Sequence, residues 1–324
     1  MTLEAVAQRI TQGERLILAA DEELLARLPH GSWIGGSIPY FMADDGGTCT
    51  KDMIFVDEVP SVATRVSIRS YDEQALPAIA ADEFDDGYTM LIIPAFSGVH
   101  TSFAKNSPQY KDIFLRPLVG WISGLHLADL GRVTPKVFNG QTGQRSDAHA
   151  VAMHIELPPS KVANLDIVNL FTQSAGDVIT FDTTGFSASD CFVNGEKTSF
   201  AAYLNEKKVN TQLPLVADYC GAMINTSFQS VDAEKNVVAF YAPVFKGIEY
   251  KIAAPVSDYV QEFKSKVDTL HVAPVFTCNC ILNYLYSELE GKKTSHITGP
   301  ITFGEIAYQL LNQTMVYLTV EDAA

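Results

Sequence analysis

The apolar positions near the start of the chain repeat at helical spacing. Between residues 3 and 27 they fall at Leu3, Val6, Ile10, Leu16, Leu24 and Leu25. Because residues three or four apart lie on the same face of a helix, this spacing predicts one or two amphipathic helices. We therefore expect residues 1–29 to form an N-terminal helical segment.

Strand patterns dominate the next part of the chain. Runs of apolar and β-branched residues, bounded by turn residues, predict strands at 32–41, 51–59, 63–71, 89–96 and, as a hairpin, within 137–157. A Gly-Gly turn between the first two runs predicts that they form a hairpin. A short helix, interrupted by Pro77, is expected before the buried strand at 89–96.

The second half of the chain alternates in the same way. Residues 177–206 predict two strands, a turn and a helix. Two further strands are predicted on either side of Lys246-Gly247, and a helix is expected from Ser257, which is a typical N-cap residue. A strand that runs into a helix and a final strand complete the pattern.

This alternation predicts a mixed α/β fold with two sheet-containing halves. We expect the first half to comprise residues 30–175 and the second to comprise residues 176–324. The boundary is placed near residues 173–177 because a polar segment with Gly176 separates the two patterns there.

Composition narrows the classes of protein that these elements can form. The chain has 324 residues and a net charge of −15. Nucleic acids and anionic membranes attract clustered Lys and Arg, so this charge disfavours both kinds of partner. The first residues lack the basic start and apolar run of a signal peptide, and no stretch reaches the ~18 apolar residues of a membrane span. We expect a cytoplasmic protein.

Cys278 and Cys280, separated by one residue in a strand-like run, are the first candidates for chemistry. A structural zinc site needs four ligands, and His271 and His296 provide no second pair of closely spaced ligands. A nucleophile needs a base beside the thiol, and nothing in the sequence requires either histidine to lie there. Packing of two small thiols in the core is the third interpretation. With five cysteines in a long chain, reduced thiols are expected.

Other patterns give less indication of chemistry. His149 and His154 lie five positions apart on a predicted strand and so face opposite sides, which disfavours them as neighbouring metal ligands. No phosphate-binding loop, dinucleotide fingerprint or zinc-protease motif occurs. We predict no metal site. The missing motifs disfavour the common nucleotide-dependent and hydrolytic enzymes without excluding catalysis.

Several segments resemble the FIST family of bacterial sensory domains. The C-terminal half carries "APVFKGIEY" (242–250), "APVFTCNC" (273–280), "ITFGEIA" (301–307) and "LNQTMVYL" (311–318). Their order resembles that of the strand and turn motifs in the C-terminal part of FIST proteins. The segment "WIGGSIPYF" (33–41) resembles the Gly-Gly strand start of the N-terminal part. The resemblance covers residues 30–320, is strongest after residue 177, and implies a FIST-like fold.

The resemblance implies a small-molecule-binding sensory protein that acts in signal transduction through a partner protein. We expect its ligand pocket between the two halves, because pockets favour such boundaries. The expected ligand-binding residues are Gly35, Gly36, Ser37, Cys278, Asn279, Glu305, Asn312 and Thr314. Two alternatives stay open: an enzyme that uses Cys278 with Glu305 as acid or base, and a structural or assembly protein without a ligand.

The resemblance also raises the question of haem, which some FIST proteins bind. Haem needs an axial ligand such as histidine. Leu311 stands where the family commonly has histidine, so we predict no haem and no other cofactor. The expected partners are a small-molecule ligand and a signalling protein. The sequence leaves open whether the chain forms a homodimer.

Overall fold

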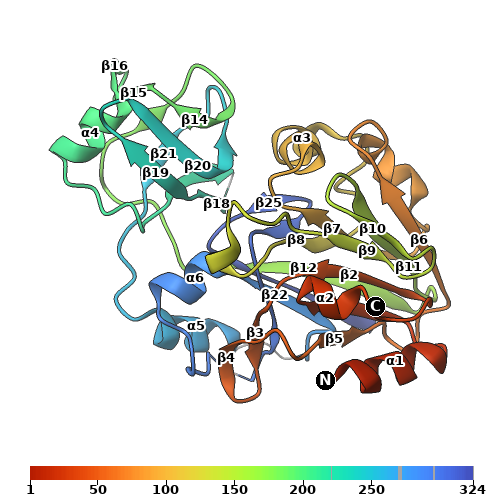
Figure 1. Cartoon of the computed structure of the whole chain (residues 1–324). Coiled ribbons are helices and arrows are strands. Elements are labelled where there is room, and N and C mark those ends of the chain that lie inside the picture. Colours follow the sequence, from red (N-terminus) through yellow and green to blue (C-terminus); the bar gives the residue numbers. More distant parts are fainter. Residues whose placement is uncertain (220, 269–271, 295, 324) are drawn as a thin grey trace. The chain divides into compact units, whose positions relative to one another are not determined.

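The computed structural model describes residues 1–219, 221–268, 272–294 and 296–323. The chain divides into two compact units (Figure 1). Unit 1 contains residues 1–168, 263–310 and 315–324, and unit 2 contains residues 169–262 and 311–314. The fold is mixed α/β, as the sequence predicts. The chain enters unit 2 a few residues before the expected boundary but returns to unit 1 within helix α5 (Tyr259–Val267). The units are therefore not two consecutive halves.

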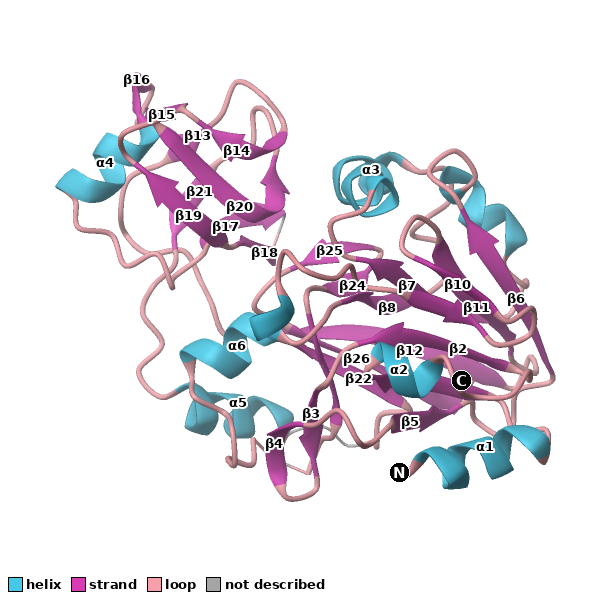
Figure 2. Ribbon diagram, in the orientation of Figure 1, coloured by secondary structure: helices cyan, strands magenta, loops and turns pink. Residues whose placement is uncertain are grey.

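Unit 1 contains three sheets, whose strands are drawn in Figure 2. The first sheet has the order β10 (Gln144–Ser146), β9 (Val137–Asn139), β2 (Trp33–Ser37), β1 (Leu16–Ala20) and β5 (Phe55–Glu58). The second has the order β25 (Gln309–Leu311), β24 (Glu305–Ala307), β8 (Leu118–Ser123), β7 (Gly87–Pro94), β11 (Ala150–Glu156) and β6 (Arg65–Tyr71). The third has the order β12 (Lys161–Val168), β26 (Met315–Asp322), β22 (Phe276–Cys280), β23 (Gly299–Thr302), β3 (Tyr40–Ala43) and β4 (Gly46–Cys49).

In each sheet of unit 1, two neighbouring strands of the described chain run parallel and are connected through a helix. The connections are β1 to β2 through α2 (Glu22–Leu25), β7 to β8 through α3 (Gly98–Asn106), and β22 to β23 through α6 (Ile281–Tyr286). Parallel strands end at the same edge of their sheet, so each connection brings two carboxyl ends together. Figure 2 shows α2 lying over β2.

The expected N-terminal helical segment is partly wrong. Helix α1 (Leu3–Thr11) forms as predicted, and the Thr2 side chain accepts a hydrogen bond from the Ala5 N–H at its start. Residues 16–20, however, form β1 rather than a helix, and all five are buried. A strand that is buried on both faces has a continuous run of apolar residues. Over so few residues, such a run also fits the spacing of a helix.

The hairpin that was predicted near residue 45 forms, but with a different second strand. Its turn at Asp44 and Asp45 connects β3 to β4, whereas β5 pairs with β1 in another sheet. The remaining helical segments of unit 1 are short 3₁₀ helices, namely η1 (Leu76–Asp82), η2 (Ser107–Gln109) and η3 (Leu127–Asp129).

The second sheet of unit 1 contacts the other two sheets through β8. The Trp121 ring of β8 stacks on Phe276 of β22, with ring centroids 5.7 Å apart. On the first sheet, the α-carbon of Gly36 lies against Trp121 and Ile92. Because these side chains are fully buried, Trp121 lies at the centre of the unit's core.

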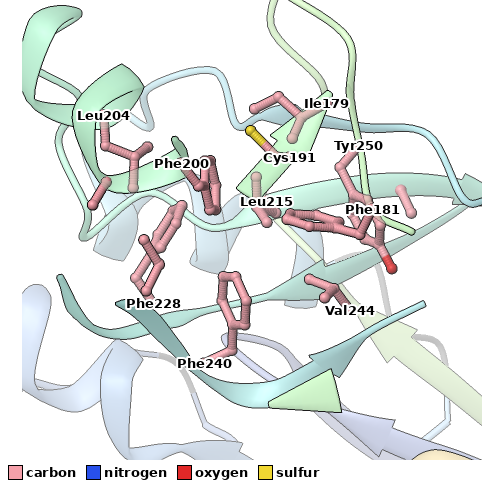
Figure 3. Close-up of a cluster of buried hydrophobic side chains, with 13 residues drawn as sticks. Ile179, Phe181, Cys191, Phe200, Leu204, Leu215, Phe228, Phe240, Val244 and Tyr250 are labelled. Carbon is pink, nitrogen blue, oxygen red and sulfur yellow. The ribbon is translucent and has the colours of Figure 1, made fainter. Parts of the chain in front are cut away.

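The described residues of unit 2 form two sheets and one complete helix. One sheet has the order β16 (Glu196–Ser199), β15 (Asp190–Val193), β13 (Ile179–Thr180), β21 (Tyr250–Ile252), β17 (Leu215–Tyr219) and β18 (Ala222–Thr226). The other has the order β14 (Gly185–Ala188), β20 (Val237–Val244) and β19 (Phe228–Asp232). Helix α4 (Phe200–Glu206) packs on a separate aromatic core formed by Phe181, Phe200, Phe228, Phe240 and Tyr250 (Figure 3). Among the described residues, no helix is long and apolar enough to cross a bilayer.

Candidate functional site

Gly35 and Gly36, two of the expected ligand-binding residues, are packed against neighbouring side chains of unit 1. A Cβ on Gly36 would lie 2.7 Å from Ile92 Cγ2 and 2.9 Å from Trp121 Nε1. A Cβ on Gly35 would lie 3.2 Å from the Trp33 ring. The missing side chains therefore allow β2 to approach its neighbours closely, and these glycines serve packing within unit 1.

Cys278 and Glu305 lie near each other in the interior of unit 1. Both side chains are fully buried. Cys278 lies on β22, and Glu305 lies on β24, where it pairs with Trp121 of the neighbouring strand β8. The Cys278 thiol donates a hydrogen bond to the Gly120 carbonyl oxygen, with an Sγ–O distance of 3.4 Å. Burial, reinforced by the Glu305 carboxylate, raises the pKa of the thiol well above its ordinary value. A thiol that stays protonated is a poor nucleophile, so the surroundings favour a packing role.

Asn279 and Cys280 participate in the start of α6. The Asn279 Oδ1 atom accepts hydrogen bonds from the Cys280 N–H at 2.7 Å and from Asn283 Nδ2 at 2.9 Å. His271 lies outside the described residues, and His296 is exposed. In the part of the chain that the structure describes, no group of three His, Cys, Asp or Glu side chains is arranged to hold a metal ion.

Asn312 and Thr314 belong to unit 2, in the segment 311–314. They precede β26 and are not on the last strand, where the sequence placed them. Both are buried. The Asn225 side chain donates a hydrogen bond to the Asn312 carbonyl oxygen at 3.1 Å, and Ser227 Oγ donates to Gln313 Oε1 at 2.7 Å. The expected site residues are thus divided between the two units, and this segment is bound into the polar core of unit 2.

Ser37, another of the expected ligand-binding residues, lines an open cavity. Its hydroxyl donates a hydrogen bond to the Gly124 carbonyl oxygen at 2.7 Å and accepts one from the Lys136 N–H at 2.8 Å. Ser37 is the last residue of β2, and Gly124 directly follows β8. One buried hydroxyl therefore connects the carboxyl ends of strands from two sheets.

The cavity beside Ser37 has a volume of about 230 Å³. It lies where β1, β2 and β8 end, and carboxyl ends of parallel strands are the usual position of ligands in α/β sheets. We call it the acidic cavity. Its lining consists of Asp21, Glu22, Glu23, Ser37, Ile38, Pro39, Lys51, Gly124, Leu125, His126, Asp129, Val133 and Thr134.

The charges of the acidic cavity are mostly negative. Four carboxylates line it against a single lysine, Lys51. Lys51 Nζ lies 2.9 Å from Asp129 Oδ2 and 3.8 Å from Asp21 Oδ2. The hydrogen bond between Lys51 and Asp129 raises the pKa of Lys51 and lowers the pKa of Asp129. One ammonium group is thus shared between two carboxylates. Arginines outside the lining pair with two of the four carboxylates, Arg132 with Asp129 and Arg145 with Glu22. The negative charge that can attract a second cation therefore lies on Asp21 and Glu23.

His126 forms an aromatic side of the acidic cavity. Its ring stacks on Tyr40 with centroids 5.8 Å apart, and its Nδ1 atom accepts a hydrogen bond from the Ala128 N–H at 3.2 Å. The Tyr40 hydroxyl in turn accepts a hydrogen bond from the Leu127 N–H at 3.1 Å. Because Nδ1 is an acceptor, the neutral ring carries its proton on Nε2. These contacts fix a flat polar ring beside the carboxylates.

A second group of polar residues, which the sequence did not indicate, lies elsewhere in unit 1. The Tyr71 hydroxyl donates to Asp82 Oδ2 at 2.9 Å and contacts His154 Nε2 at 2.7 Å. His154 Nδ1 lies 2.8 Å from Thr89 Oγ1. Tyr71 has one proton to donate, so His154 must donate from Nε2 and accept from Thr89. Burial lowers the pKa of His154 to about 4, which keeps the ring neutral.

Glu83 lies beside this chain of hydrogen bonds. Both of its carboxylate oxygens are buried and have no hydrogen-bond partner among the described residues. Thr89 gives its proton to His154 and therefore has none left for Glu83. Burial raises the pKa of Glu83 to about 7. None of these residues lines the acidic cavity.

The sequence matches a family of unknown function, DUF6976, over residues 1–321. The chain belongs to the DUF6976 family. No curated protein and no solved structure matched the chain. Because DUF6976 carries no assigned activity, the function of this DUF6976 chain has to be argued from its geometry.

The sequence indicated one wall of the acidic cavity and missed the others. The "IGGS" segment led to Ser37, but Asp21, Lys51 and Asp129 lie in separate turns. They meet because β1, β2 and β8 end close together, and no local pattern encodes that proximity. A usable signal was the acidic Asp-Glu-Glu run that directly follows the apolar run at 16–20.

Proposed function

We propose that this DUF6976 protein is a small-molecule-binding sensory protein that acts through a partner protein. The acidic cavity is the proposed binding site, and an amine-bearing small molecule is the proposed class of ligand. The observation that carries the proposal is the position of four carboxylates and one shared lysine where three strands end. The resemblance to FIST sensory domains supports the sensory part.

The size of the cavity supports a compact ligand. Drug-sized ligands occupy roughly 300–1,000 Å³, whereas the acidic cavity has about 230 Å³. An ammonium group placed near Asp21 would leave Lys51 paired with Asp129 alone. The Ser37 and His126 side chains are fixed by hydrogen bonds, so they are already ordered before a ligand binds. Such pre-organisation lowers the entropy cost of binding.

Calorimetric titration with putrescine and L-lysine tests this proposal, with glutarate as the anionic control. We expect saturable binding of at least one of the two amines and no binding of glutarate. Asp21→Asn removes a carboxylate whose side chain is 19% exposed and retains the ability of residue 21 to cap α2. We expect this variant to bind the amine about tenfold more weakly, because it loses a charge-assisted hydrogen bond.

Asp52→Asn is the matched control, because Asp52 is exposed, directly follows Lys51 and does not line the cavity. It should bind the amine like the unmodified protein. Stronger binding of glutarate than of the amines, or equal amine affinity of Asp21→Asn and the unmodified protein, would contradict the proposal. The sensory part is tested separately by whether the amine changes the set of proteins that the chain captures in an extract.

A further inference from the structure

Unit 1 has a larger cavity, whose lining residue Arg145 forms an ion pair with Glu22 of the acidic cavity. It has a volume of about 520 Å³, which falls within the range of small-molecule sites. Its walls come from α2 and the turn after it, from Trp33 on β2, and from the β9–β10 hairpin. We call it the tryptophan cavity, after Trp33. It shares no lining residue with the acidic cavity.

One wall of the tryptophan cavity is aromatic and held in place. The rings of Trp33 and Phe138 are stacked with centroids 6.4 Å apart and an interplanar angle of 27°. The Trp33 indole N–H donates a hydrogen bond to the Pro29 carbonyl oxygen at 2.9 Å, which fixes the orientation of the ring. Trp33 is 3% exposed and Phe138 is 4% exposed, so a planar or apolar group in the cavity contacts a small, already ordered part of each ring.

Two glycines of the β9–β10 hairpin make room for the rings that line the cavity. A Cβ on Gly140 would lie 2.3 Å from the Trp33 ring. Gly143 has a positive φ of 72°, and a Cβ there would lie 2.7 Å from His30 Nε2. A side chain at either position would push Trp33 or His30 out of place. The hairpin backbone is thus shaped to the two rings.

The ionisable side chains that line the tryptophan cavity are basic. Arg145 and His30 are its titratable lining residues, and no carboxylate belongs to the lining. This is unusual in a chain whose net charge is −15. Arg145 Nη1 lies 3.2 Å from Glu22 Oε1, and the Arg145 side chain is 52% exposed. A guanidinium has five N–H donors in a planar fork, and this contact occupies one nitrogen atom.

We propose that the tryptophan cavity binds a small anionic molecule with a planar apolar body. The anionic group would lie on Arg145 and the planar body against Trp33 and Phe138. This ligand class is opposite in charge to the amine proposed for the acidic cavity, and the inference does not depend on that proposal.

Nuclear magnetic resonance with 1-naphthoate as the probe tests this inference. The chain has two tryptophans, so the ¹H–¹⁵N spectrum contains two indole signals. Trp33→Phe identifies its own signal by its loss. Trp121 is buried in the centre of unit 1 and serves as the internal control of folding. We expect 1-naphthoate to shift the Trp33 signal saturably and to leave the Trp121 signal in place.

The role of the charge is tested with Arg145→Gln and with 1-naphthalenemethanol, a neutral probe of similar shape. We expect Arg145→Gln to bind 1-naphthoate about tenfold more weakly and to bind the neutral probe unchanged. Arg27→Gln is the matched control, because Arg27 is exposed on the turn after α2 and does not line the cavity. It should bind 1-naphthoate within about twofold of the unmodified protein. An unshifted Trp33 signal, or equal affinity in Arg145→Gln, would overturn the inference.

Discussion

At the scale of single residues, the number of protons on each buried polar side chain determines the direction of its hydrogen bonds. Ser37 has one proton to donate, which goes to Gly124, while its oxygen accepts from Lys136. The chain of hydrogen bonds through His154 is directional for the same reason. The sequence could not indicate these partners, because Tyr71, Thr89 and His154 lie on three different strands. Their proximity depends on the register of the second sheet.

Glu83 provides a test of this residue-scale reasoning through the pH dependence of stability. Its pKa is about 7 in the folded chain, against roughly 4.3 for an unperturbed glutamate. Between these values the folded state binds one proton more than the unfolded state, so stability decreases as pH rises. Glu83→Gln removes this dependence. At pH 8 the variant should be more stable by about 1–2 kcal/mol, a value reduced from the full effect because Glu83 is partly exposed as a residue, although its carboxylate oxygens are buried.

Urea denaturation at pH 5 and pH 8 measures this effect. At pH 5, which is close to the pKa of an unperturbed glutamate, we expect a much smaller difference in the free energy of unfolding between Glu83→Gln and the unmodified protein than at pH 8. Glu206→Gln is the control, because Glu206 is exposed at the end of α4. It should show no such difference between the two pH values. A Glu83→Gln variant that is less stable at pH 8 would mean that the Glu83 carboxylate is stabilised by its surroundings.

At the scale of elements, patterns of burial decided which predictions from the sequence succeeded. Helix α1 and the β3–β4 turn were recognised because their apolar and turn residues follow local rules. Strand β1 was mistaken for a helix, since all of its residues are buried. The chain enters unit 2 after residue 168, whereas the sequence predicts a boundary at residues 173–177, and it returns to unit 1 at Phe263, where the sequence predicts no boundary. That return occurs inside α5, where the sequence shows no linker.

The positions of the cysteines on strands β22 and β4 predict which thiols react. Cys278 and Cys280 are buried within β22, whereas Cys49 on β4 is half-buried. Burial also raises the pKa of Cys49, but its partial exposure leaves it accessible. We expect iodoacetamide at pH 8 to label Cys49 in the folded protein and to label Cys278 and Cys280 only after unfolding. Mass spectrometry of the digested protein locates the labels. Rapid labelling of Cys278 in the folded protein would instead favour the thiol enzyme.

At the scale of the whole molecule, each unit has a core of its own. Unit 2 is built on the aromatic cluster shown in Figure 3, and unit 1 on three sheets that meet around Trp121. The two cavities both lie in unit 1, and we propose that they bind ligands of opposite charge. Glu22 lines the acidic cavity and Arg145 lines the tryptophan cavity, and the two side chains form an ion pair. Residues that follow β1 line both cavities, so the two proposed binding sites lie close to this part of the chain.

We propose that the acidic cavity holds an amine-bearing small molecule. The most direct measurement is mass spectrometry of the compounds released from natively purified protein, compared between the unmodified chain and Asp21→Asn. We predict an amine-bearing compound in near-stoichiometric amount from the unmodified chain and from Asp52→Asn, and a clear depletion in Asp21→Asn. Release of an anionic compound, or of an amine in equal amount from Asp21→Asn, would contradict the claim.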